Sequence, residues 1–329
     1  MPSIRRVAMA LASVMIAMPF NASCTVISRQ PMELLDEPLA LRDVPESAYF
    51  DLKAPSHDLF RHVSLKDDTV QQSFAFDQKN RRLFVSQRRN GTPMESGDLT
   101  ITYLSFDGKY LGHMYLTGFG HGVAFGAEPV GTDTYLWTEV DSKSNGYGER
   151  LARFKFVNGK TVSRDSTALT KFKPIPSAPS IIAVINPVDN TLVCRYTSGS
   201  TKRITAFPLK DATAGNFANP LYDFEQPEVD VFQGYAAYGS YVYMLSGTSY
   251  EANGNIIDSE VTSINVNTGK VRQGPVLTKA GSTLTFREPE GMAVYTTAAG
   301  EPRLFLGFAS GKAGDRRSNL FYKNELLGN

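Results

Sequence analysis

From Val70 onward, short apolar stretches alternate with clusters of Gly, Asn, Asp and Pro. This pattern, without an amphipathic stretch of helical length, predicts strands joined by tight turns. Five stretches share one arrangement, in which a polar residue precedes two small or apolar residues, an alanine and further apolar residues. They are QSFAFD (72–77), HGVAFG (121–126), SIIAVI (180–185), QGYAAY (233–238) and EGMAVY (290–295). Their alanines lie 49, 59, 53 and 57 residues apart, which indicates an internal repeat.

Each repeat continues with a second apolar strand, and most continue with a third and a fourth. The second strands are RRLFVSQ, TYLWTEV, TLVCRY, YVYMLSG and PRLFLGF. Four antiparallel strands that recur about every 50 residues are typical of a β-propeller blade. The fifth repeat has only three strands, and the segment 58–67 before the first repeat can supply the fourth. The sequence therefore predicts an all-β, five-bladed β-propeller of four-stranded antiparallel blades, closed by this N-terminal strand.

The N-terminus has the three-part pattern of a secretory signal peptide. A basic start, MPSIRR, precedes an apolar run at 7–20 and small residues before Cys24. The run is too short to span a bilayer comfortably. We expect a signal peptide at 1–24, a flexible leader at 25–46 and the propeller at 47–329, in a secreted, extracellular protein. Lipid anchoring through Cys24 is the alternative for the N-terminus.

The charge balance argues against a nucleic-acid partner. The chain has 34 Lys and Arg against 33 Asp and Glu, so its formal net charge is +1 and no strongly basic face is required. Cys194 lies in the apolar stretch TLVCRY and is expected to be a buried structural thiol. No Cys and His spacing resembles a zinc site. We expect a monomer with no transmembrane segment and no cofactor.

Polar residues at the starts of the inner strands are expected to face a funnel at the propeller axis. They are Gln72, His121, Ser180, Gln233 and Glu290. Residues from the second strands and from two loops are expected to join them: Gln87, Trp137, Glu139, Tyr147, Arg195, Tyr196, Arg287 and Glu288. Amides and carboxylates bind sugar hydroxyls, aromatic rings stack on sugar rings, and arginine pairs with carboxylate or phosphate. This set predicts a site for carbohydrate.

Structural roles are the alternative for single members of this set. Polar residues at strand ends often satisfy backbone groups that have no other partner. We interpret Asp67, Asp68 and Asp141 as loop caps, with a structural Ca²⁺ site as the alternative.

Four stretches of the chain resemble a known family. They are DLFRHVSLKDDTVQQSFAFDQKNRRLFVSQ, GFGHGVAFGAEPVGTDTYLWTEVD, NGYGERLARFKFVNG and AGSTLTFREPEGMAVY. They resemble secreted proteins described as teichoic acid biosynthesis protein C-like, which are grouped with the propeller domain of phage receptor-binding proteins. The resemblance covers nearly the whole mature chain. It implies a five-bladed propeller that contacts cell-surface or extracellular glycans, and it supplies no catalytic residues.

The first functional hypothesis is binding of a polysaccharide or cell-wall glycan, with an acidic glycan favoured, through the polar funnel. A glycoside hydrolase that uses Glu139, Glu288 or Glu290 is the weakest alternative, because two of these carboxylates lie in one tetrapeptide.

The second hypothesis is a polysaccharide lyase that cleaves next to a uronic acid by β-elimination. This reaction needs a cation for the uronate carboxylate, a base for the C5 proton and an acid for the leaving oxygen. Arg195 or Arg287 would be the cation and His121 the base. Tyr147 or Tyr196 would be the acid. The assignment rests on analogy with other propellers of this chemistry.

Overall fold

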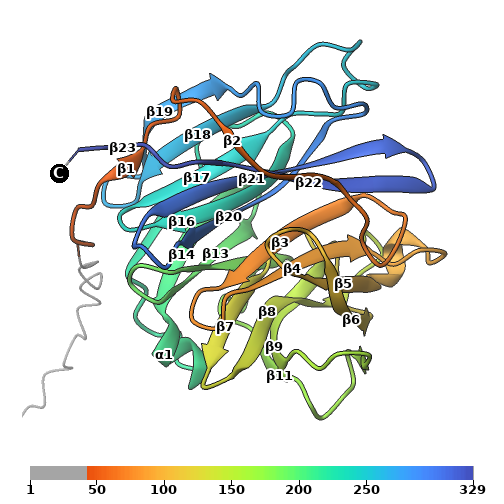
Figure 1. Ribbon diagram of the computed structural model, residues 1–329. Helices are drawn as coiled ribbons and strands as arrows, with labels where there is room; N and C mark the ends of the chain where they lie inside the picture. Colours follow the sequence, from red (N-terminus) through yellow and green to blue (C-terminus); the bar gives the residue numbers. More distant parts are fainter. Residues whose placement is uncertain (1–42, 329) are drawn as a thin grey trace, which may run out of the picture. The chain divides into compact units, whose positions relative to one another are not determined.

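The structure, a computed structural model, describes residues 43–328 and folds them into five β-sheets round a common axis (Figure 1). Each of these five sheets contains four antiparallel strands, ordered from the axis outward, and one of them has an additional parallel strand at its edge; a sixth sheet has only two strands. The inner strands of neighbouring sheets contact one another all the way round the ring. The prediction of an all-β, five-bladed propeller is confirmed.

In each blade the strands follow one another in sequence order from the axis outward. The exception is the outermost strand of blade 5, which precedes blade 1 in the sequence. Blade 1 contains β3 (Gln71–Asp77), β4 (Arg82–Arg88), β5 (Leu99–Leu104) and β6 (Tyr110–Thr117). Blade 2 contains β7 (Gly126–Val130), β8 (Asp133–Ser142), β9 (Gly148–Lys155) and β11 (Thr170–Phe172). Blade 3 contains β12 (Ile181–Asn186), β13 (Thr191–Ser198), β14 (Thr201–Pro208) and β15 (Tyr222–Glu225). Blade 4 contains β16 (Phe232–Tyr238), β17 (Tyr241–Ser246), β18 (Glu260–Asn265) and β19 (Lys270–Leu277). Blade 5 contains β20 (Glu288–Thr296), β21 (Pro302–Lys312), β22 (Asp315–Lys323) and β2 (His57–Val63).

Hydrophobic side chains fill the space between neighbouring blades. Within residues 43–328 the buried apolar residues form five clusters, and each joins two consecutive blades. The cluster between blades 5 and 1 combines Phe74 and Phe76 with Tyr295 and Phe305. Both faces of the inner strands are thereby covered, which is why β3 has no exposed side chain. Cys194 is a free thiol in the cluster between blades 2 and 3, and burial raises its pKa, so its predicted structural role is confirmed.

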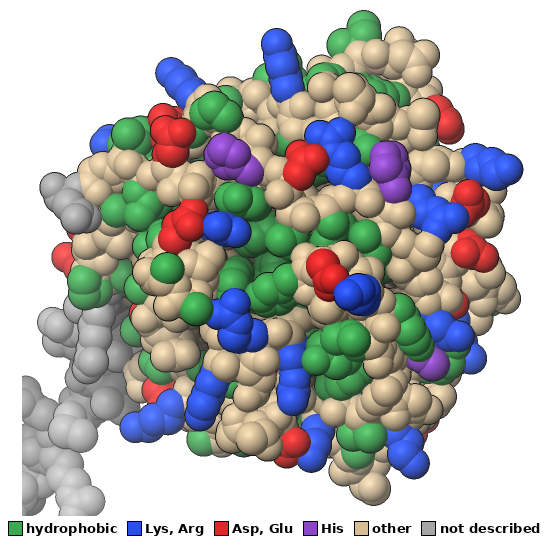
Figure 2. Space-filling model, in the orientation of Figure 1, with side chains coloured by type: hydrophobic (Ala, Val, Ile, Leu, Met, Phe, Trp, Pro, Cys, Tyr) green, Lys and Arg blue, Asp and Glu red, His purple; other side chains and the backbone are tan. Residues whose placement is uncertain are grey.

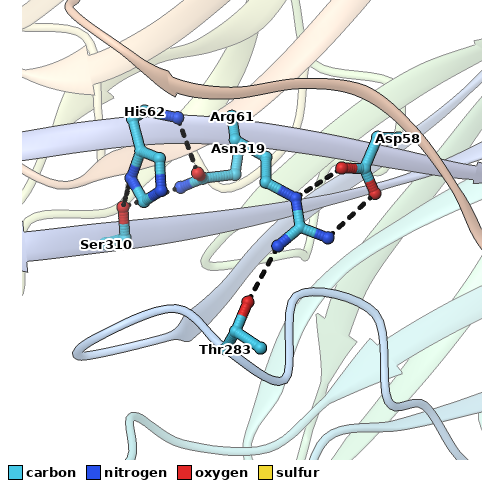
Figure 3. Close-up of polar contacts among 6 residues, drawn as sticks. All are labelled: Asp58, Arg61, His62, Thr283, Ser310 and Asn319. Atoms are coloured by element: carbon cyan, nitrogen blue, oxygen red, sulfur yellow. Dashed lines mark hydrogen bonds and ion pairs between the residues drawn. The ribbon is translucent and has the colours of Figure 1, made fainter.

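Strand β2 closes the ring by pairing antiparallel with β22, as the sequence predicts (Figure 1). The register of this pair is irregular, and His62 within it has a positive φ of 56°. Figure 3 shows the side chains that hold this irregular segment: the His62 N–H donates to Asn319 Oδ1 at 2.8 Å, and Arg61 binds both the Asp58 carboxylate and the Thr283 hydroxyl. The closing strand is therefore tied to blade 5 and to the loop that leads into it.

Residues before β2 lie on blade 4. The Val44 N–H donates to Asn267 Oδ1, and the Glu46 carboxylate accepts a hydrogen bond from the Asn267 amide, each at 2.8–2.9 Å. These contacts involve residues 43–46, which the sequence places in the leader. The two-residue strands β1 (Tyr49–Phe50) and β23 (Leu326–Leu327) then pair with each other. The predicted signal peptide, Cys24 and the leader up to residue 42 lie outside the described residues.

The search for membrane-spanning helices covers the same part of the chain. No helix within residues 43–328 has the length and hydrophobicity needed to cross a bilayer.

The inner strand of blade 2 departs from the predicted repeat. It begins at Gly126, so the segment 121–125, expected to be strand, has no ladder partner in β8. The alanine that lies beside the repeat alanines of blades 1, 4 and 5, in an axial cavity of about 70 Å³, is therefore Ala127 rather than Ala124. The chain between β9 and β11 also differs from expectation, because β10 (Thr161–Ser163) pairs parallel with β6 of blade 1.

Two short helical segments occur among the strands of residues 43–328. They are η1 (Met94–Ser96), between β4 and β5, and α1 (Leu209–Thr213), between β14 and β15.

Two glycines lie where inner strands approach each other closely. A Cβ on Gly234 would lie 2.7 Å from Gly291 Cα, and a Cβ on Gly291 would lie 2.6 Å from Ser73 Cα. Crowding of blades 4, 5 and 1 at the axis thus explains both positions, as the repeat suggests. Gly122, the third glycine of the repeat, instead faces the side chains of Ser86 and Leu99.

We predict that Gly291→Ala destabilises the propeller far more than Gly300→Ala. The two glycines have φ values of 84° and 83°, so both substitutions carry the left-handed penalty of about 1–2 kcal/mol. A Cβ at position 300 meets no atom within 4 Å, whereas at position 291 it collides with backbone, which adds roughly 1–3 kcal/mol. Urea unfolding of both variants measures the difference, and equal losses would contradict the importance of axial crowding.

Candidate functional site

The end of the axis at which the inner strands begin is called the mouth here. Three of its five predicted polar residues, Gln72, Gln233 and Glu290, stand where the register between the inner strand and its neighbour shifts. A bulge takes a residue out of the ladder and redirects its side chain. The Gln72 amide donates to the Gln71 carbonyl and the Gln233 amide to the Gly247 carbonyl, at 3.2 and 2.9 Å. Each of these two side-chain amides therefore uses at least one N–H in a hydrogen bond to nearby backbone.

In blade 2 a buried carboxyl group replaces part of the backbone ladder. Glu139 on β8 has no exposed surface and accepts the Gly122 N–H at Oε1 (2.8 Å) and the Gly148 N–H at Oε2 (2.6 Å). Burial raises the pKa of Glu139 to about 7, against the lowering effect of these backbone hydrogen bonds. The carboxyl group therefore ties the segment that carries His121 to the loop that carries Tyr147.

His121 and Tyr147 form a stacked pair at the mouth. Their ring centroids are 5.0 Å apart and their planes differ by 10°. The His121 Nδ1 atom is buried and has no hydrogen-bond partner among the described residues. Burial lowers the pKa of His121 to about 4, and the charge of Arg88 acts in the same direction. The imidazole is therefore neutral at neutral pH. Burial raises the pKa of Tyr147, so its phenol keeps its proton there.

Arg195 supplies a positive charge without a protein counter-ion. Its guanidinium carbon lies 3.8 Å from the centroid of the Phe232 ring, and Nε donates to Gln226 Oε1 at 2.6 Å. No Asp or Glu of residues 43–328 lies within ion-pair distance of it. Burial lowers the pKa of Arg195 to about 10, so it remains charged at neutral pH. A partly buried cation without a carboxylate partner is suited to an anionic ligand.

A pocket of about 420 Å³ opens beside Arg195, between blades 2, 3 and 4. Tyr147, Tyr196 and Phe232 contribute aromatic surface to its wall. Asn145, Ser180, Thr197 and Lys202 contribute polar groups. A concave site with aromatic rings and a few polar groups is typical of a small-molecule or carbohydrate site.

Tyr196 and Tyr147 differ in what their hydroxyl groups do. The Tyr196 hydroxyl donates to Asp223 at 2.7 Å and accepts from Arg203 at 3.2 Å. Burial, together with Asp223, raises the pKa of Tyr196 to about 12. Tyr147 has no such partners among the described residues, and 38% of its surface is exposed. Tyr147 is therefore the better placed of the two to meet a ligand.

Three residues expected at the mouth lie inside the protein instead. The Gln87 side-chain amide donates to two backbone carbonyls of the segment that follows the closing strand. Trp137 donates its indole N–H to a buried glutamate. Arg287 donates to two backbone carbonyls and a serine hydroxyl. None of the three has exposed surface. Their side chains point between the blades, because both faces of a blade are covered by its neighbours.

Glu288 and Glu290 lie on β20, on the blade 5 side of the mouth. Burial raises the pKa of both, and repulsion from Glu288 adds to the effect on Glu290. Neither lines the pocket that contains Arg195, although the charge of Glu290 acts on Tyr147.

Two of the three aspartates considered for Ca²⁺, Asp67 and Asp141, have protein partners for their carboxylates. Asp67 accepts the Asn90 N–H at 3.2 Å, and Asp141 pairs with Lys171 at 2.5 Å and with Arg150 at 3.8 Å. Across residues 43–328, no three His, Cys, Asp or Glu side chains are grouped as metal ligands would be. The expectation that no cofactor is needed stays a prediction.

The sequence did not point to Phe232, Gln226 or Lys202. Phe232 directly precedes the repeat residue Gln233, but an aromatic residue at a strand start carries no sign that an arginine will stack on it. Lys202 is a second cation in the wall of the pocket. Burial lowers its pKa, and the charge of Arg195 acts in the same direction.

On the face drawn in Figure 2, Lys and Arg side chains are interspersed with Asp and Glu.

Comparison with known proteins agrees with this architecture. The family described as "Phage 5-bladed beta propeller receptor binding platform domain" matches residues 70–322. The Bacillus subtilis (strain 168) protein described as "Putative major teichoic acid biosynthesis protein C" is 29% identical over 285 residues, which cover 83% of this chain and 63% of that protein. The tail fiber of Staphylococcus aureus phage P68 has a similar structure, with a TM-score of 0.68 and 18% identity over 84% of this chain and 54% of that chain. The chain thus spans less than two thirds of both proteins.

We predict that Glu139→Gln alters the pH dependence of stability. The pKa of Glu139 rises from an ordinary 4.5 to about 7 on folding, so the folded protein binds more protons than the unfolded chain between these values. The free energy of unfolding of the native protein therefore falls as pH rises through this window, and the amide variant lacks this contribution. The variant also leaves one backbone N–H facing an amide NH₂, which costs roughly 1–3 kcal/mol.

The stability deficit of Glu139→Gln should therefore shrink as pH rises from 4.5 to 7. Urea unfolding at several pH values measures it. A deficit that is constant with pH would show that Glu139 does not change protonation in this range.

Proposed function

Since the chain belongs to the family of phage 5-bladed β-propeller receptor-binding platform domains, we propose that it binds a glycan outside the cell through the mouth of the propeller. The glycan is acidic, a polysaccharide or cell-wall polymer, and the protein acts as a secreted monomer. The observation that carries this proposal is Arg195, a partly buried guanidinium that lines a pocket of about 420 Å³ and has no carboxylate partner among the described residues.

The chemistry of the pocket favours an anionic sugar. The Nε atom of Arg195 is used by Gln226, which leaves the two terminal amino groups of the guanidinium for a carboxylate or phosphate. Lys202 adds a second positive charge to the wall. Tyr147 retains exposed ring surface, and aromatic rings of this kind stack on the apolar faces of sugar rings. One cation and one ring next to each other would fix both the charge and the orientation of a sugar residue.

We predict that Arg195→Gln weakens binding of acidic glycans about tenfold to a hundredfold, because a hydrogen bond to a charged group contributes roughly 1.5–3 kcal/mol. Arg272→Gln is the matched control, since Arg272 also stacks on an aromatic ring, that of Tyr49, but lies on the outer strand of blade 4. Binding to an array of acidic and neutral glycans, followed by calorimetry on the best ligand, measures the change. Equal affinities of both variants and the native protein would refute the proposal.

A polysaccharide lyase is the second candidate, and the His121–Tyr147 pair favours it. In a β-elimination, His121 would take the C5 proton of a uronate, the electrons of the C–H bond would form the C4–C5 double bond, and the C4–O bond would break. Tyr147 would protonate the leaving oxygen, and Arg195 would neutralise the carboxylate. The neutral imidazole and the protonated phenol are the forms that this sequence of steps requires. Arg287 drops out of this scheme because it has no exposed surface.

We predict for this candidate that incubation with acidic polysaccharides produces unsaturated uronates, seen as a rise in ultraviolet absorbance. His121→Ala should abolish the rise, because the base is lost, while glycan binding persists through Arg195. His113→Ala is the control, since His113 lies on β6, the outer antiparallel strand of blade 1. Binding without any product in the native protein would exclude the lyase and leave the binding proposal intact.

A further inference from the structure

We propose that a second site, a groove on the outer flank of the propeller, binds a tetrahedral oxyanion, the phosphate or sulfate group of an ester or the free ion. The groove has a volume of about 560 Å³ and lies between the end of β19 in blade 4 and the N-terminal segment that leads into β2. It shares no residue with the pocket at the mouth. The site therefore stands independently of the glycan-binding proposal.

The charges that line the groove are mostly positive. Four cationic side chains contribute, those of Lys53, Arg61, Lys279 and Lys323, against the single carboxylate of Asp58. Asp58 is already bound by Arg61 through both of its oxygens, as Figure 3 shows. The three lysines have no Asp or Glu within ion-pair distance among residues 43–328. An ammonium group binds as a point charge and suits phosphate or sulfate, whereas the planar fork that recognises carboxylates is occupied.

Lys323 is the group that distinguishes this groove from an ordinary basic surface. It is 3% exposed, and its ammonium group has one hydrogen-bond acceptor in the described part of the chain, the Ala54 carbonyl. An ammonium group has three N–H donors. Asp51 and Glu325 act on it only at longer range, and burial lowers its pKa. Burying an unpaired charge is costly, so a buried ammonium group in the wall of a groove is best compensated by an anion there.

The wall of the groove is held in place by two arginines. Arg287, behind the wall, donates to the Thr278 and Ala280 carbonyls at 2.8–3.0 Å. Arg61, at the open side, donates to the Thr283 hydroxyl at 2.9 Å. The segment 278–283 is therefore fixed at both ends before any ligand arrives, which reduces the entropic cost of binding.

The test is a titration of the full chain with inorganic phosphate and with sulfate, followed by thermal unfolding and calorimetry at constant ionic strength set with acetate. Both oxyanions should raise the melting temperature, and acetate alone should not. Lys323→Met removes the charge and keeps the length of the side chain, and should abolish the response. The double variant Lys53→Gln/Lys279→Gln changes only exposed side chains, and should weaken binding about tenfold or more. Lys109→Gln, at an exposed turn of blade 1 that does not line the groove, should bind as the native protein does.

Retention of the native response by a folded Lys323→Met variant would overturn the proposal. If that variant does not fold, the double variant decides: an unchanged affinity overturns the proposal as well. Long-chain polyphosphate and dextran sulfate then identify the source of the anion. Dextran sulfate carries sulfate esters and polyphosphate carries phosphoanhydrides, so competition by either polymer for the same groove assigns the site to an oxyanion on a polymer chain, and its absence assigns the site to the free ion.

Discussion

The close approach of five inner strands round one axis is the constraint on which the rest of this protein depends. At Gly234, Gly291 and Ser73 the backbones of three blades are so near that no side-chain carbon fits between them. Small residues at these positions allow the inner strands to converge, and the bulges of blades 1, 4 and 5 lie at the same level. A bulge takes a residue out of the ladder and redirects its side chain. The irregular backbone at Gln72, Gln233 and Glu290 thus lies next to the close packing that closes the propeller.

The inner strand of blade 2 is arranged differently, and this blade contributes the His121–Tyr147 pair to the candidate site. Its inner strand starts late, and the carboxyl group of Glu139 takes the place of the missing ladder partners. A ladder would have fixed His121 in a regular strand. The carboxyl group instead lets the segment approach the loop with Tyr147, so that the two rings stack. Burial raises the pKa of Glu139 to about 7, which shows that this arrangement has a free-energy cost. A carboxylate loses more solvation free energy on burial than a backbone carbonyl does. The irregularity and the chemistry of the site have the same origin.

The repeat in the sequence was sufficient to predict the blades, their number and the closing strand, because alternating apolar stretches and turns determine where strands begin and end. It was not sufficient to predict which side chains of those strands are buried between the blades. Gln87 lies at the end of β4 and Arg287 directly precedes β20, as mouth residues would, yet both are fully buried. In a propeller, neighbouring sheets cover both faces of each blade, so the period of two that separates inside from outside in a single sheet carries little information. Contacts such as the stacking of Arg195 on Phe232 join residues of different blades and have no local signal in the sequence.

The distribution of charge indicates how the protein would recognise an anion. A formal net charge of +1, with both signs interspersed on the face in Figure 2, gives no strong long-range field. Two cations that lack a carboxylate partner among the described residues are instead shielded from water, Arg195 at the mouth in part and Lys323 on the flank almost completely. Exposed charges are screened by salt within about 10 Å, whereas buried ones are screened much less. Long-range attraction of an anion would therefore be weak. Discrimination between anions would occur on contact, where an anion that reaches Arg195 or Lys323 forms an ion pair that salt screens only weakly. This arrangement suits recognition of particular anionic groups on a polymer better than general adhesion to an acidic surface.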